Sequence, residues 1–323
     1  MRAMNGVAAR RALRIGGLGF RALGLVMLGV GIVSLALGPL EMVCFTWFEE
    51  GGRFAYEGFG FGSFMFGSMA MQILGYYSIA ALLIPLGVAH LRLRRWARTV
   101  TQALVWCWVV LGVPLLVVFL AILLGTKELS PASGTIAAVV GTLSYVALPG
   151  LLMALYGSDL ARATFDADGH ALSDEIEGLG VRVLVVALLE AFWAVALHVL
   201  LFFGGLFPIL TGWVTDLPGY ALVDASILSL LVVIWGTVRR RAWAWWAAVI
   251  YFIGMTVLWV GTLATTTWPG LLAVLSFPAY EVDLLDGVPA QGWHFALLVG
   301  LPLAGTLVAL GRACITWRAA SQT

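Results

Sequence analysis

The sequence contains few charged residues. Of its 323 residues only 11% are Asp, Glu, Lys or Arg, whereas 62% are hydrophobic. Soluble domains carry about 25% charged and about 45–50% apolar residues. A soluble fold could not cover so large an apolar core, which excludes a soluble enzyme and a disordered chain. The net charge of +1 gives no electrostatic reason to expect a nucleic-acid partner.

Cysteine and histidine are also scarce. The three cysteines, Cys44, Cys107 and Cys314, are scattered and form neither a metal-binding spacing nor a disulfide framework. The chain lacks the G-x-S-x-G and H-E-x-x-H patterns of hydrolases and zinc proteases. We therefore expect no metal, no cofactor and no catalytic site, and the chain is not expected to be an enzyme.

Long apolar runs dominate what remains. A membrane-spanning helix needs about 20 mostly apolar residues. Eight segments meet this requirement, namely 18–40, 66–89, 101–124, 134–156, 181–205, 220–238, 244–267 and 294–314. The sequence therefore predicts an all-α polytopic transmembrane bundle of about eight helices, with a lipid bilayer as its surroundings. The apolar stretch 268–280 is too short to span and is interpreted as interfacial or re-entrant.

The basic residues indicate the topology. With eight spans, sixteen of the eighteen Lys and Arg residues fall on one side of the membrane, and only Arg53 and Lys127 on the other. Basic loops are retained in the cytoplasm, so both termini are predicted to be cytoplasmic. The main topology anchors are the two short basic turns, Arg94 and Arg95 in the first half and Arg239, Arg240 and Arg241 in the second. The excess of Arg over Lys favours a GC-rich bacterial genome, and hence a bacterial inner membrane.

The two halves of the chain resemble each other. Residues 18–21 (LGFR) and 179–182 (LGVR) both introduce the first span of a half. A short basic turn follows the second span of each half. These features suggest a parallel 4+4 internal repeat, divided as a transmembrane half 1–156, an acidic cytoplasmic loop 157–182 and a second transmembrane half 183–323. The alternative is that such motifs are ordinary membrane-interface composition.

A few polar side chains fall inside the predicted spans. Glu190 and His198 lie in the fifth span and Asp224 in the sixth, where His198 and Asp224 are expected at similar depth. Gln72 reaches a comparable depth in the first half. Ionisable groups at such depth are costly and usually face the bundle interior. We consider two interpretations of this intramembrane network, a proton-coupled path and a structural set of interhelical hydrogen bonds.

The first outer loop, about 41–65, combines glycine with many phenylalanines. It fits either a cap or docking surface over the bundle or an interfacial aromatic belt.

Three functional hypotheses follow. The first is a non-catalytic subunit or scaffold of a membrane complex, whose partners are other membrane subunits. The second is a transporter or channel for a neutral or amphiphilic solute, proton-coupled through Glu190, His198 and Asp224. The third is an intramembrane enzyme or sensor. A dry interface between the halves favours the scaffold, and a polar cavity there favours transport; the sequence does not specify the oligomeric state.

Overall fold

The computed structural model describes residues 6–125, 130–166, 174–275 and 289–320, together with Phe277, Ala279, Val282 and Leu285. Eight helices in this described part are long and apolar enough to cross a membrane. The prediction of an all-α transmembrane bundle is therefore confirmed. The chain is an integral membrane protein surrounded by lipid.

Seven of the eight spans are single helices. They are α1 (Gly6–Phe48), α2 (Phe64–Leu91), α3 (Arg95–Gly125), α7 (Asp174–Phe202), α8 (Asp216–Val238), α9 (Ala242–Thr265) and α12 (Gly292–Ala320). The fourth span joins α4 (Pro131–Thr142), a π-helical turn η1 (Leu143–Ala147) and α5 (Leu148–Gly157). Pro149 accounts for the π-helical turn, because its ring has no N–H and would clash with the carbonyl of Tyr145 in a regular α-helix.

Shorter elements lie between the spans. Helix α6 (Asp159–Asp166) follows the fourth span, and strands β1 (Phe207–Pro208) and β2 (Trp213–Val214) form an antiparallel pair between α7 and α8. Helix α10 (Trp268–Val274) occupies the stretch expected to be interfacial or re-entrant, and it is too short to span. Much of the predicted acidic loop 157–182 is helical, and its residues 167–173 lie outside the described part of the chain.

Helix α1 is longer than expected. The predicted end at residue 40 was wrong, because residues 41–48 continue the helix and shorten the outer loop to 49–63. These added residues are mostly apolar and pack on the start of α2. The Phe45 and Phe66 ring centroids, for example, are 5.1 Å apart.

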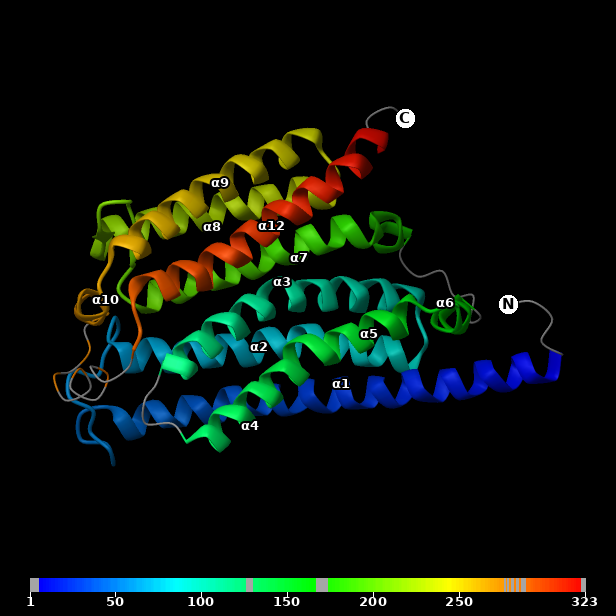
Figure 1. Cartoon of the computed structure of the whole chain (residues 1–323), viewed down its shortest axis with the longest axis horizontal. Coiled ribbons are helices and arrows are strands. Elements are labelled where there is room, and N and C mark those ends of the chain that lie inside the picture. Colours follow the sequence, from blue (N-terminus) through cyan, green and yellow to red (C-terminus); the bar gives the residue numbers. More distant parts are fainter. Residues whose placement is uncertain are drawn as a thin grey trace.

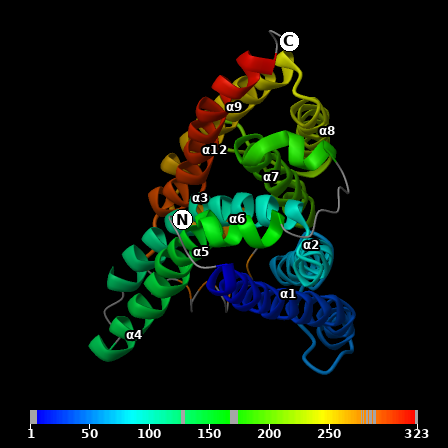
Figure 2. The same ribbon diagram turned by 90° about the vertical axis from the view of Figure 1, so that its right-hand side faces the viewer.

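The spans run roughly side by side along the long axis of the molecule (Figure 1). The start of α1, the end of α12 and the basic turns α2–α3 and α8–α9 lie toward one end, while α10 lies at the other. Seen from the end that carries the termini, the fourth span slants away from the other helices (Figure 2). In that span only 6% of the most apolar stretch is buried.

Helices α1 and α2 pack through glycine. Gly24, Gly31 and Gly38 are spaced seven residues apart on α1, and all three are buried. A Cβ atom at Gly24 would lie 2.6 Å from His90 Cβ and 3.0 Å from the Gly87 carbonyl oxygen. The seven-residue spacing places all three glycines on the face of α1 that packs on α2. Because glycine has no side chain, the two backbones can approach closely there.

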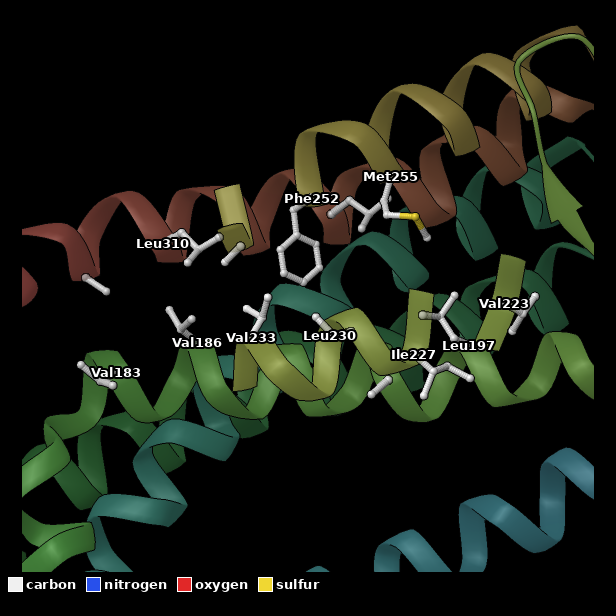
Figure 3. Packing of buried hydrophobic residues seen from close by; sticks show 14 of the residues in the cluster. Val183, Val186, Leu197, Val223, Ile227, Leu230, Val233, Phe252, Met255 and Leu310 are labelled. Carbon is white, nitrogen blue, oxygen red and sulfur yellow. The ribbon is translucent and has the colours of Figure 1, made fainter. Parts of the chain in front are cut away.

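The second half has the largest hydrophobic core. Buried residues of α7, α8, α9 and α12 form one cluster that includes Phe252, and Figure 3 shows Leu230 and Val233 of α8 facing its ring. Helix α3 of the first half packs against α7 and α12, which joins the two halves. The 4+4 repeat itself stays a prediction.

Candidate functional site

The predicted intramembrane network does not form one cluster. Its four members, Glu190, His198, Asp224 and Gln72, make separate contacts in the structure. No hydrogen bond or ion pair joins any two of these four described side chains. We therefore consider each position on its own.

Glu190 is fully buried between α7 and α8. Its Oε1 accepts a hydrogen bond of 3.1 Å from the hydroxyl of Thr237, which is also fully buried. Its Oε2 has no hydrogen-bond partner among the described residues. Thr237 is the second-last residue of α8, so the bond fixes Glu190 beside the end of α8 that leads into the basic turn. The arrangement is a half-satisfied buried polar pair that holds α7 to α8.

The other three side chains are less buried. His198 is half-buried, and its Nδ1 donates to the Ala194 carbonyl oxygen of its own helix at 2.7 Å. Gln72 is exposed and donates to the Ser68 carbonyl oxygen, also within its own helix, at 3.4 Å. Asp224 is exposed on α8, eight residues after the helix begins. The expectation that these groups face the bundle interior therefore fails for Asp224 and Gln72, whose helices turn them outward.

The Glu190–Thr237 bond leads to a stability prediction. Thr237→Val keeps the shape of the side chain but removes the donor, leaving a buried carboxyl without its hydrogen bond. We expect a loss of about 1–3 kcal/mol of unfolding free energy. Thr256→Val is the matched control, because the Thr256 hydroxyl donates only to Phe252 in its own helix. Equal melting temperatures of the two variants in detergent would contradict the assigned role of Thr237.

A second buried polar group lies in the first half. His90 on α2 is fully buried, and its Nδ1 lies 2.8 Å from the Leu86 carbonyl oxygen and its Nε2 2.8 Å from the Tyr156 hydroxyl. Because a carbonyl only accepts, Nδ1 carries the proton, and Nε2 accepts from Tyr156. Phe20 and Phe165 pack around this pair. The imidazole is thus held in one tautomer and shielded from solvent.

The same site ties down the end of the fourth span. The Tyr156 carbonyl oxygen accepts from Arg98 Nε at 3.0 Å and from Gln102 Nε2 at 2.9 Å. Carbonyls in the last turn of a helix have no partner within the helix, so these side chains of α3 supply one. Sequence reasoning missed this site, since His90 and Tyr156 are 66 residues apart and no local spacing links them.

Tyr156→Phe is expected to destabilise the first half. The change removes one hydroxyl and leaves His90 Nε2 with the Thr101 hydroxyl, 3.4 Å away, as its nearest side-chain donor, so we expect a cost of about 1 kcal/mol. The measurement is thermal unfolding in detergent. Tyr145→Phe serves as the control because Tyr145 is half-buried and its hydroxyl makes no hydrogen bond within the described part of the chain. A Tyr156→Phe melting point no lower than that of the control would show that the hydrogen bond contributes nothing.

The arginines predicted as topology anchors occupy the two basic turns. Arg94 ends the α2–α3 turn, and Arg95 begins α3 with its Nε 3.5 Å from Asp166 Oδ1. Arg239 lies over the Trp235 ring, 5.2 Å from its centroid. Arg240 and Arg241 complete the α8–α9 turn. The Arg95–Asp166 pair is exposed on both sides, so it orients α6 without adding much stability.

Chemistry that needs a metal has no ready set of ligands in the described part of the chain, where no three His, Cys, Asp or Glu side chains gather closely enough to hold an ion. No family model, curated protein or solved structure matches this chain.

Proposed function

We propose that this integral membrane protein is a non-catalytic subunit or scaffold of a membrane complex, placed in a bacterial inner membrane with cytoplasmic termini. The proposal includes a specific contact, in which a transmembrane helix of a partner subunit packs on α8 at Asp224. We also propose that the chain is not itself an enzyme. The observation that supports it best is the outward position of Asp224.

Asp224 lies well inside the span. Eight residues at 1.5 Å each put it about 12 Å from the first residue of α8. Its neighbours on the exposed side of the helix include Leu228 and Leu231, which are 62% and 49% exposed. Lipid suits those leucines but not a carboxylate, which costs about 2.5–3.5 kcal/mol near the centre of a spanning helix. A partner helix that donates hydrogen bonds or a positive charge would remove this cost.

Gln72 supports the same interpretation. It also lies eight residues after the start of its span, Phe64, and its side chain is exposed. The second span of each half thus turns a carboxyl or amide side chain outward, eight residues after its helix begins. A helix surface that faces only lipid has no need of polar side chains, so Asp224 and Gln72 both favour a contact with protein.

The experiment is native mass spectrometry after gentle extraction from the source membrane. The proposal expects stoichiometric co-purification with a second membrane protein, which is lost when Asp224 is replaced by Leu but kept after Asp216→Leu. Asp216 is the matched control, because it is an exposed carboxylate at the start of the same helix. A wild-type chain that is always monomeric would contradict the proposal.

Transport of a neutral or amphiphilic solute is the second candidate, and Glu190 favours it. A fully buried carboxyl with one unpaired oxygen among the described residues is a group that could take up and release a proton. The test is proton flux into liposomes holding the purified chain, with wild type compared with Glu190→Gln. Flux that disappears in Glu190→Gln would favour transport, and equal flux in both would end this candidate.

A further inference from the structure

A crevice lies where the two halves meet. Its volume is about 460 Å³, and it is bounded by α3, α7 and α12. Nine residues line it, among them Val110, Val185, Gly305, Ala309 and the arginines Arg182 and Arg312. Seven of these nine residues are apolar. The crevice is therefore suited to hydrocarbon and not to a hydrated solute.

The wall of the crevice is well packed. Val185 is 7% exposed and belongs to a small buried cluster that includes Cys107 on α3 and contacts Ala309 on α12. Gly305 lets α12 approach α3, because a Cβ atom there would lie 2.7 Å from Val110 Cγ1. The crevice is thus formed by three helices, α3, α7 and α12, that pack closely against one another.

Two arginines from different helices share the crevice. Arg182 stands two residues after Gly180, where the backbone of α7 breaks at φ 69° and ψ 153°. Arg312 lies near the end of α12. Both are exposed, and neither forms an ion pair or a hydrogen bond within the described ranges.

Three other arginines at this end of the bundle have side-chain partners in the chain, whereas Arg240 and Arg241 have none within the described ranges. Arg95 pairs with Asp166, Arg98 donates to the Tyr156 carbonyl oxygen, and Arg239 lies over Trp235. If Arg182 and Arg312 served only as topology anchors, nothing would require them to share one apolar crevice. Guanidinium groups bind phosphate through paired N–H donors, and basic pockets between transmembrane helices bind anionic lipid headgroups.

We propose that this crevice binds one anionic phospholipid from the surrounding leaflet. An acyl chain lies along Val110, Val185 and Ala309, and the phosphate is held by Arg182 and Arg312. The inference is independent of the proposed function, because it concerns the α3–α7–α12 junction and not the exposed side of α8.

The test uses delipidated protein in detergent and native mass spectrometry. Phosphatidylglycerol and phosphatidylcholine with identical acyl chains are titrated into wild type and into Arg182→Gln/Arg312→Gln. We expect one phosphatidylglycerol to bind wild type more tightly than phosphatidylcholine does. The double variant should bind it about 30-fold more weakly, because each arginine near the membrane surface contributes roughly fivefold to the affinity for an anionic lipid. Equal binding by wild type and the double variant would overturn the proposal.

Two controls separate this site from general attraction of anions. Arg239→Gln/Arg241→Gln removes the same charge from the α8–α9 turn and should leave phosphatidylglycerol binding unchanged; an equal loss there would overturn the specific site. Ala309→Phe fills the crevice while keeping both arginines, and should also weaken phosphatidylglycerol binding. Displacement of the lipid by millimolar inorganic phosphate, with no effect of Ala309→Phe, would assign the arginines to a soluble anion and contradict the lipid site.

Discussion

Gly24→Leu is expected to lower the free energy of unfolding by about 3 kcal/mol, the upper end of the usual cost of overpacking. At this position a Cβ atom already comes within 2.6 Å of His90 Cβ and 3.0 Å of the Gly87 carbonyl oxygen. Backbone atoms cannot rotate aside, so α1 and α2 must separate to admit the side chain. His90 would move with α2, and its bond to Tyr156 would be strained as well.

The matched control is Gly29→Leu on the same helix. Gly29 is exposed, and a Cβ atom there would meet nothing within 4 Å. Both variants make α1 more apolar, so membrane insertion should not distinguish them. Thermal unfolding in detergent should therefore show a large loss for Gly24→Leu and almost none for Gly29→Leu. Similar losses for both would mean that close α1–α2 packing does not stabilise the fold.

Asp224→Leu is expected to weaken the partner complex at least 30-fold while leaving the isolated chain as stable as wild type. Truncating one member of a buried charge pair costs about 2–5 kcal/mol, and every 1.4 kcal/mol is a factor of ten in affinity. Since Asp224 makes no hydrogen bond or ion pair with other described residues, the fold itself should not depend on it. The measurement is the dissociation constant of the purified partner in lipid nanodiscs.

Asp224→Asn gives the internal control for that experiment. The amide keeps the size of the side chain and part of its hydrogen bonding, so its loss of affinity should be smaller than that of Asp224→Leu. Unchanged affinity in Asp224→Leu, with a normal melting temperature, would rule out a partner contact at this position.

The architecture could be predicted from the sequence because the length of an apolar run decides whether a helix can span. All eight runs became spans. The errors arose where local geometry decides, as at residues 41–48, where aromatic contacts with α2 continue α1 into the expected loop. The α1–α2 glycine seam was missed although its seven-residue spacing is visible in the sequence.

The candidate site was harder to predict. The position of a residue along a helix indicates its depth in the membrane. The face of the helix that packs on its neighbours can be inferred only where buried and exposed residues differ in polarity. In a membrane that difference is weak, because exposed residues such as Leu228 and Leu231 are as apolar as the buried Val223 and Leu230. Asp224 could therefore be assigned to the sixth span while its outward orientation remained invisible. The inward face of α8 is marked by the buried residues Val223, Ile227 and Leu230, which only the structure identifies.

Photo-cross-linking on α8 in the native membrane decides whether a partner helix lies against Asp224. A photoreactive amino acid is placed at Ala221 or Leu228, one turn on either side of Asp224, and at Ile250 on the exposed side of α9, which is 69% exposed. We expect one protein adduct of constant mass from Ala221 and Leu228, abolished by Asp224→Leu, and lipid adducts alone from Ile250. Lipid adducts alone at all three positions would contradict it.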